Sequence, residues 1–155
     1  MPLTTMAGVL GMTDRSKIRD LLGRLYKARM GGKPEEVAEL FSTDADFAIL
    51  GAGQRYPVSI TAKGRAEIRT TIALLSRISK LRHYDLISLI VDGDDAAIQW
   101  RATVHSKLAA RPCFTEFVDI VKVSDNHIQC YTELFAPHAV PAGPATVRAL
   151  NAIKF

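Results

Sequence analysis

The chain has little cysteine, a single tryptophan and no long apolar run. Two cysteines, Cys113 and Cys130, occur among its 155 residues. Neither lies in a CxxC pair or near a histidine at the spacing of metal ligands, which argues against metal and redox sites. Alternation along the predicted strands places the two thiols on opposite faces of a sheet, where they cannot form a disulfide. We expect both thiols to be buried and inert.

Other absences exclude whole classes of protein. No segment approaches the ~18 apolar residues of a membrane helix. The stretch MPLTTMAGVLGMTDR has no basic residues ahead of its mildly apolar part, unlike a signal peptide. The 20 basic and 16 acidic residues are scattered, without a basic run interleaved with aromatics. The GAG at 51–53 lacks the spacing of a phosphate-binding loop. We expect a cytoplasmic protein with no membrane, nucleic-acid, metal or cofactor partner.

What is present is enough apolar sequence for one domain, since 48% of the residues are hydrophobic. Periodicity and turn residues predict helices from Thr13 or Asp14 to Met30, from Pro34 to about Ser42 and from Gly64 to Lys80. Strands are predicted at 47–50, 83–92, 96–107, 113–123 and 127–136, with an irregular rim at 54–63. Residues 1–12 and 137–155 are expected to be loosely ordered arms.

This order of elements predicts an α+β fold, in which three helices pack on a strongly curved, mostly antiparallel sheet that encloses a pocket. Alternation within Asp85–Phe135 assigns one set of side chains to the inner face of that sheet. The set comprises Trp100, Phe117, Asp119, Tyr131, Glu133 and Phe135. An apolar wall that carries two carboxylates and a phenol is typical of a small ligand cavity.

The opposite, outer face is mixed in character. It carries Gln99, Arg101, Thr103 and His105 beside Phe114, Val118 and Ile120. Because an exposed apolar sheet face is otherwise a liability, we predict a homodimer through this face.

Four stretches resemble the nuclear-transport-factor-2-like fold, in particular its ketosteroid-isomerase and SnoaL-like polyketide-cyclase branch. They are GGKPEEVAELFSTDADFAI, GRAEIR, VDGDDAAIQWRATV and VDIVKVSDNHIQCYTELF. The resemblance as a whole covers roughly residues 15–136. The stretches come in order and at the right spacing. The resemblance implies the cone-shaped fold, whereas this fold hosts isomerases, cyclases, dehydratases, epoxide hydrolases and non-catalytic modules.

The resemblance carries over to residues only in part. It puts Asp119 at the place of the isomerases' oxyanion-binding acid, and Ile49 at the place of their general base. The oxyanion tyrosine falls on Leu25, one residue short of Tyr26. Isoleucine cannot take a proton, so steroid isomerisation itself is not expected. The epoxide-hydrolase branch needs an inward arginine flanked by aspartates, whereas Arg101 faces outward and has no Asp two residues on.

The residues themselves leave two roles open for each acid. Asp119, if desolvated, has a raised pKa and can act as an acid or proton shuttle. Alternatively it is structural, bonded to Tyr131, Trp100 or a first-helix side chain. Glu133 either forms a proton-transfer pair with Asp119 or is solvated at the mouth or paired with an arginine. His83 is either a base at the pocket mouth or a solvated residue.

Two functions from different classes follow. The first is a cofactor-independent isomerase, cyclase or lyase acting on a small apolar carbonyl or hydroxylated compound. Its acid–base groups would be Asp119, Tyr131, Glu133 and His83, and its pocket walls would be Tyr26, Ile49, Tyr56, Trp100, Phe117 and Phe135. The second is a non-catalytic dimeric module that binds a small ligand in the same cavity.

Overall fold

The computed structural model describes residues 4–51 and 58–135, with side chains described from residue 15 onward. The helices are α1 (Thr4–Met30), α2 (Pro34–Glu39) and α3 (Gly64–Ile78). The strands are β1 (Phe41–Gly51), β2 (Val58–Lys63), β3 (Ser79–Asp92), β4 (Asp95–Ser106), β5 (Cys113–Ser124) and β6 (His127–Phe135). This is the predicted α+β class.

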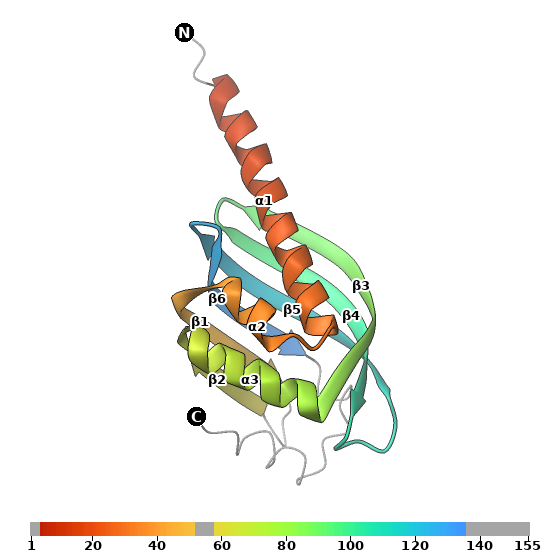
Figure 1. Cartoon of the computed structure of the whole chain (residues 1–155). Coiled ribbons are helices and arrows are strands. Elements are labelled where there is room, and N and C mark those ends of the chain that lie inside the picture. Colours follow the sequence, from red (N-terminus) through yellow and green to blue (C-terminus); the bar gives the residue numbers. More distant parts are fainter. Residues whose placement is uncertain (1–3, 52–57, 136–155) are drawn as a thin grey trace.

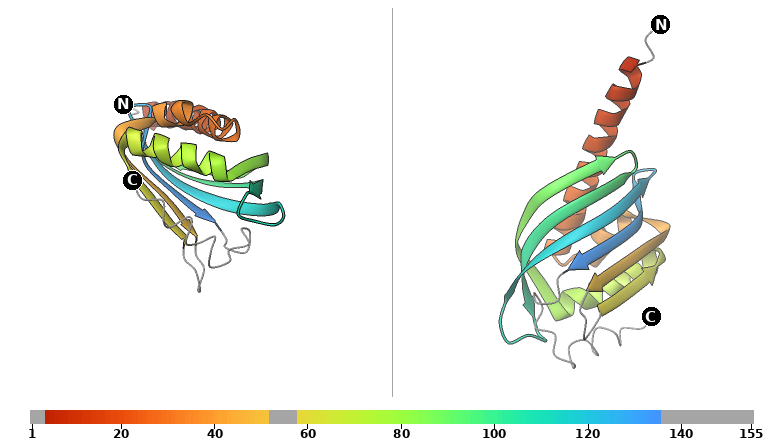
Figure 2. Two further views of the ribbon diagram at one scale, coloured as in Figure 1. Left: turned by 60° about the horizontal axis from the view of Figure 1, so that its bottom comes forward. Right: turned by 180° about the vertical axis from the view of Figure 1, so that it is seen from behind.

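The six strands form one curved sheet in the order β2-β1-β6-β5-β4-β3. All neighbours are antiparallel except β1 and β6, which pair in parallel. The helices lie on one side of this sheet, and the opposite face is left open (Figures 1 and 2). The N-terminal part of α1 extends beyond the sheet (Figure 1). The sheet does not close, so β2 and β3 remain as its edges.

The predicted end of the first helix is confirmed, and it matters for the site. Gly32 adopts a left-handed φ of 63°, which glycine adopts at little cost. The amide of Lys33 donates to the Ala28 carbonyl at 3.0 Å, which closes the helix terminus. The last helical turn is thereby fixed in place, and this turn carries Arg29.

Several predicted boundaries were wrong. α1 begins at Thr4 rather than at Thr13 or Asp14, because residues 4–12 continue the helix instead of forming an arm. The strand predicted at 47–50 runs over Phe41–Gly51, and α2 is correspondingly shorter. The segment expected to be irregular contains β2, in which Val58, Ile60 and Ala62 are buried in strict alternation. The arm predicted at 137–155 lies outside the described residues.

The two faces of the sheet differ as alternation predicts. In β5 the buried residues Thr115, Phe117, Asp119, Val121 and Val123 alternate with exposed ones. The outer face carries large exposed apolar side chains, among them Phe114 at 59%, Ile120 at 48%, Leu134 at 41% and Val118 at 38% exposure.

The structure corrects the prediction that both cysteines are buried. Cys130 is exposed and Cys113 is half-buried, so neither thiol is buried as predicted, and no disulfide joins them. Cys130 lies at an outward-facing position of β6, and strand alternation outweighs the general preference of cysteine for the interior.

No described helix is long and apolar enough to cross a membrane.

Candidate functional site

A cluster of polar side chains lies between α1 and the inner face of the sheet. Asp119 comes from β5, and the register places Glu133 of β6 directly opposite it, with Tyr131 two residues before Glu133. Trp100 comes from β4, while Tyr26 and Arg29 come from the last turns of α1. All of these side chains are buried or nearly so. The sequence predicted the strand residues of this cluster and their shared face.

Three donors converge on one oxygen of Asp119. The Tyr26 hydroxyl donates to Oδ2 at 2.5 Å, Trp100 Nε1 at 2.7 Å and the Tyr131 hydroxyl at 2.7 Å. Oδ1 is buried and has no hydrogen-bond partner among the described residues. Because Oδ2 accepts three hydrogen bonds and Oδ1 accepts none, a proton bound to this carboxyl group is carried by Oδ1.

The Tyr131 hydroxyl connects the two acids. It lies 2.7 Å from Asp119 Oδ2 and 3.0 Å from Glu133 Oε2. It also accepts a bond from Arg29 Nη1 at 3.0 Å, and Arg29 forms an ion pair with Glu133. A phenol has one proton, so Tyr131 donates to one carboxylate at a time. The hydroxyl is therefore a switchable bridge between Asp119 and Glu133.

The charges of the cluster explain its protonation. Two acids share one cation, Arg29, in a buried setting where an unpaired charge is costly. Burial, and after it the charge of Glu133, raises the pKa of Asp119 from 3.8 to about 7. Arg29 and the tyrosine hydrogen bonds act in the opposite direction but do not outweigh these causes. With a proton on Asp119, the cluster has no net charge.

The other titratable groups keep their ordinary protonation. Burial, reinforced by the charge of Asp119, raises the pKa of Tyr26 and of Tyr131 well above the usual value for a phenol. Burial, the largest single influence, acts to lower the pKa of Arg29, but the charges of Glu133, Tyr131 and Asp119 and the hydrogen bond to Glu133 together outweigh it and raise that pKa above its usual value. Both phenols therefore remain donors and Arg29 remains a cation.

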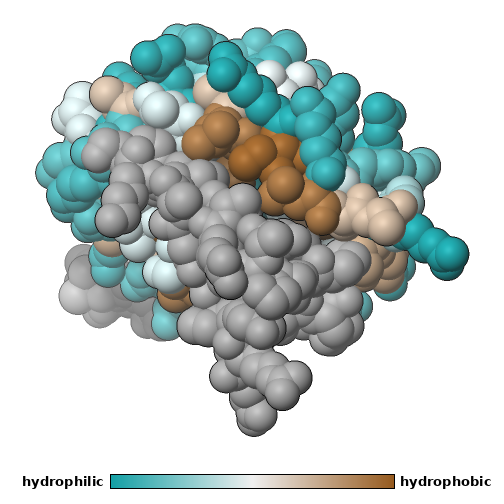
Figure 3. Space-filling view, turned by 90° about the horizontal axis from the view of Figure 1, so that it is seen from below, coloured by the Kyte–Doolittle hydropathy of each residue, from teal (hydrophilic) through white to brown (hydrophobic). Residues whose placement is uncertain are grey.

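A cavity of about 450 Å³ lies beside the cluster. Among the described residues that line it, Glu133 is the only acidic one, and Arg29 lines it too. The apolar wall is formed by Met30, Ile49, Val58, Ile60, Ile72, Leu75, Leu81, Val104, Leu108, Phe117 and Phe135. Seen from below, hydrophobic side chains gather in a patch that has hydrophilic side chains along its upper side (Figure 3).

The predicted site residues thus separate into groups. Glu133, Ile49, Phe117 and Phe135 line the cavity. Asp119, Tyr131, Trp100 and Tyr26 do not line it and lie buried behind its wall, where Trp100 stacks on Phe117 with ring centroids 4.1 Å apart. Tyr56 lies outside the described residues.

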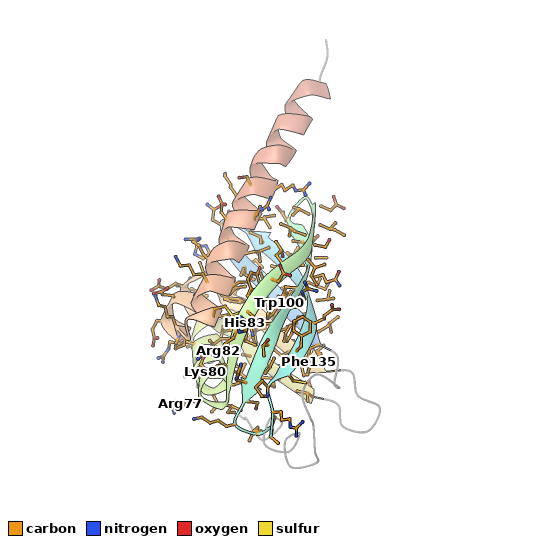
Figure 4. The ribbon with its side chains drawn as sticks, turned by 90° about the vertical axis from the view of Figure 1, so that its right-hand side faces the viewer. Arg77, Lys80, Arg82, His83, Trp100 and Phe135 are labelled. Carbon is orange, nitrogen blue, oxygen red and sulfur yellow. The ribbon has the colours of Figure 1, made fainter. Side chains whose placement is uncertain are left out.

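His83 is the one predicted acid–base residue that lies away from the others. It is exposed and does not line the cavity. It sits within β3, beyond the start of the strand, where the register slips between Arg82 and Asp85. Its φ of 54° is left-handed, which is uncommon for a residue other than glycine. Figure 4 shows it beside Arg82 on that strand.

Arg29 is the site residue that the sequence analysis did not name. It follows Tyr26 by three residues and Leu25 by four, so it continues the buried stripe of α1. A charged residue on an otherwise buried stripe was the available signal. Among the described residues, no group of three or more His, Cys, Asp or Glu side chains could hold a metal ion.

Solved structures of other proteins share this fold. A ketosteroid isomerase-like protein from Catenulispora acidiphila, in complex with trimethylamine, is 17% identical, with a TM-score of 0.66, covering 77% of this chain and 88% of its own. An NTF2-like protein from Burkholderia xenovorans is 16% identical, with a TM-score of 0.68, covering 88% and 97%. An LEH-like epoxide hydrolase from M. tuberculosis is 9% identical, with a TM-score of 0.62, covering 81% and 86%.

At these identities the likeness establishes the fold and leaves the chemistry to the site. The comparison with curated proteins finds no match for this chain. The SnoaL-like domain matches residues 22–131, which include every residue of the buried cluster except Glu133. Together with the NTF2-like architecture, this match shows that the chain belongs to the SnoaL-like domain family.

Proposed function

We propose that the protein catalyses an acid–base reaction, an isomerisation, cyclisation or elimination, on a small apolar carbonyl or hydroxylated compound held in the cavity. One observation carries the proposal: Glu133 is the only acidic side chain on the described cavity wall, and the Tyr131 hydroxyl links it to a second, buried acid. Proton transfer needs a group at the substrate and a second group that supplies or stores the proton. Glu133, on the cavity wall, would be the group at the substrate, and Asp119, linked to it through Tyr131, would be the second group.

The proton balance is simple. Ionised Glu133 takes a proton from a carbon beside the substrate carbonyl and returns it at another carbon, so no other reactant is consumed. Arg29 stabilises the ionised form of Glu133 before the transfer. When Glu133 carries the proton, Tyr131 can donate to Asp119 instead. Asp119, which has a pKa of about 7 and so is partly ionised near neutral pH, can then store this proton. Tyr131 gives its own proton to Asp119 Oδ2 and takes the proton on Glu133, and the reverse transfer returns the proton to Glu133 for delivery to the substrate.

The alternative is a ligand-binding module without catalysis. Its support is that most polar groups of the cluster are paired within it: Asp119 Oδ2 accepts three hydrogen bonds, and Glu133 is paired with Arg29, while Asp119 Oδ1 alone has no partner among the described residues. In that case the acids fix α1 to the sheet, and the apolar wall alone selects the ligand.

We also propose that the protein is a homodimer through the outer sheet face. Four large apolar side chains on β5 and β6 are between 38% and 59% exposed there, namely Phe114, Val118, Ile120 and Leu134. Positions on adjacent strands bring them together, since Val118 is directly opposite Leu134. A second copy would bury this face by the same residues.

Proton exchange in D₂O tests the catalytic proposal. We expect the wild-type protein to accelerate the loss of α-proton NMR signals from small cyclic ketones such as 2-tetralone. Glu133→Gln should lower that rate by about 100-fold or more, the usual contribution of an acid–base group. Glu39→Gln, at an exposed position near the end of α2 that does not line the cavity, is the matched control and should exchange at the wild-type rate. Ketone binding without accelerated exchange would reject catalysis of this kind and favour the binding module.

A further inference from the structure

We infer that Gly51 and Phe135 together set the size of the ligand that the cavity admits, because the glycine lets the Phe135 ring lie across β1 beside Glu133. The inference rests on the proposed function, since it concerns the ligand of the same cavity. Gly51 is buried, and it is directly opposite Phe135 in the parallel β1–β6 pair. Phe135 lines the cavity.

The Phe135 side chain lies on the inner face of the sheet. Phe135 follows Glu133 by two residues, so strand alternation puts both on one face. The ring contacts agree, since the centres of the Phe135 and Phe117 rings are 6.3 Å apart and Phe117 stacks on the buried Trp100. The strand registers thus form one row across the sheet, which runs from Trp100 through Phe117 and Phe135 to Gly51. Trp100 and Phe135 of this row are labelled in Figure 4.

Within this row the Phe135 ring leans toward β1. A Cβ atom added to Gly51 would lie 2.8 Å from Cζ of Phe135 and 3.2 Å from Cε1 and Cε2. These three atoms are the far edge of the ring. Side chains of a strand usually stand roughly perpendicular to the sheet, which would keep this edge away from a neighbouring strand about 4.8 Å to the side. The ring therefore bridges the gap between β6 and β1 and lies over the glycine.

The missing side chain at position 51 provides the place for the ring. A Cβ atom does not approach another heavy atom to less than 3.0 Å, so any other residue at 51 would displace the ring. Val58, opposite Gly51 on β2, is buried and lies on the far side of β1 from Phe135. Displaced from β1, the ring would move toward Phe117 or away from the sheet. Either movement takes space from the cavity, which Phe117 and Val58 also line.

This space adjoins the acid of the proposed reaction. Phe135 is two residues beyond Glu133, about 6.6 Å along the strand, and Gly51 is two residues beyond Ile49, the residue opposite Glu133. The cavity of about 450 Å³ can hold a small two-ring compound. With the ring lying over β1, such a compound reaches Glu133, whereas a raised ring leaves room there only for a smaller one. Phe135 therefore selects ligands by size, and Gly51 is the residue that positions it.

Two neutral ketones that differ by one ring test this assignment. 2-Tetralone has two fused rings and cyclohexanone has one, and titrations followed in amide NMR spectra measure both affinities and report the fold. We expect Gly51→Ala to weaken 2-tetralone binding about tenfold, as in a crowded apolar pocket, and to change cyclohexanone binding by less than about twofold. Both readouts are binding constants, so they do not depend on whether the ketones react.

A second substitution shows whether the ring carries the effect. Gly51→Ala/Phe135→Leu should bind 2-tetralone within about twofold of the wild-type affinity, because leucine lacks the Cε and Cζ atoms that meet the added methyl group. Gly23→Ala is the matched control, since a Cβ atom added there lies in open space among the described residues. It should leave both affinities unchanged.

Several results would overturn the inference alone. They are an unchanged 2-tetralone affinity in Gly51→Ala, an equal loss for both ketones, and a loss that Phe135→Leu does not repair. An unfolded Gly51→Ala variant whose fold Phe135→Leu restores would also overturn it, because Gly51 would then serve stability rather than ligand size. If neither ketone binds the wild-type protein, the apolar cavity of the proposed function fails as well.

Discussion

Two arginine–carboxylate pairs occupy opposite faces of the same sheet. Inside, Arg29 pairs with Glu133, with side chains 9% and 3% exposed, and its guanidinium lies 5.7 Å from the centre of the Trp100 ring. Outside, Arg101 pairs with Asp85 at 2.7 Å, with side chains 41% and 55% exposed, and lies 5.6 Å from the centre of the Phe114 ring. The chemical groups are nearly the same, and the surroundings differ.

The difference shows that burial, and not the pair itself, creates the candidate site. Water screens the outer pair, so its charges influence each other weakly and leave their neighbours unaffected. The inner pair lies beside a third charge, Asp119, without water to screen it. In the inner pair, the attraction between Arg29 and Glu133 favours a proton on Asp119 rather than on Glu133. Removal of either Arg29 or Glu133 would leave the other as an unpaired buried charge.

The largest effect should come from removing the inner arginine. Arg29→Met leaves Glu133 buried without its cation, and we expect a loss of about 3–5 kcal/mol in the free energy of unfolding. Urea denaturation monitored by circular dichroism measures it. The double variant Arg29→Met/Glu133→Gln should recover much of that loss, because no buried charge remains. Equal stability of the single and double variants would contradict a charge origin.

The next largest effect should be a dependence of the free energy of unfolding on pH. The pKa of Asp119 is raised from 3.8 in the unfolded chain to about 7 in the folded protein. Between these values the folded state binds more protons than the unfolded state, so stability falls as pH rises. This group should account for a loss of up to about 4 kcal/mol between pH ~4 and pH ~7, and no further loss above that.

Asp119→Asn is the matched variant for this pH dependence. Its amide oxygen can still accept the three bonds that reach Oδ2, and it cannot ionise. Urea denaturation at several pH values should show the variant gaining stability relative to wild type as pH rises from ~4 to ~7. A constant difference between the two proteins over this range would mean that Asp119 is already ionised at low pH.

A substitution on the outer sheet face should change the oligomeric state of the protein, with little effect on its fold. Ile120→Lys places a charge in the exposed apolar patch, and we expect it to convert a dimer of two 17.0 kDa chains into a monomer. Light scattering after gel filtration measures the mass. Thr61→Lys, exposed on β2, is the control and should remain dimeric. A monomeric wild-type protein at micromolar concentration would reject this use of the outer face.

The smallest effect should come from the outer pair. In the Ile120→Lys background, in which the outer face is not covered by a second copy, Arg101→Met should change the free energy of unfolding by less than about 1 kcal/mol, since exposed ion pairs contribute little. Measured under the same conditions as Arg29→Met, it completes the comparison of the two faces. A loss as large as that of Arg29→Met would show that exposure does not distinguish the pairs.

The sequence predicted what strand alternation determines. The shared face of Asp119, Tyr131 and Glu133 follows from a period of two residues. The sequence left open whether Tyr131 or Glu133 lies directly opposite Asp119, and the structure shows that it is Glu133. The sequence could not predict how deep each side chain lies. Asp119 and Trp100 were expected at a pocket wall, yet both lie behind it, because α1 covers them with Tyr26.

Long-range partners were the other gap. Arg29 lies 104 residues from Glu133 in the chain, and no local pattern joins the two. β2 was missed for a local reason, because a glycine-rich stretch separates its six residues from β1, with which it pairs so that Ile60 is opposite Ile49. For His83 the sequence left open a base at the pocket mouth and a solvated residue, and its exposed position away from the cavity agrees with the second. The irregularity that places it there is a property of the β3–β4 pairing.

The indole of Trp100 makes the protein its own optical reporter. It is the only tryptophan in the chain. Its Nε1 donates to Asp119, its ring stacks on the cavity residue Phe117, and the Arg29 guanidinium lies over it. Ionisation of the acid and occupation of the cavity therefore both act on one chromophore without background from another. We therefore expect the fluorescence emission of the unmodified protein to change when Asp119 ionises and when a ligand occupies the cavity.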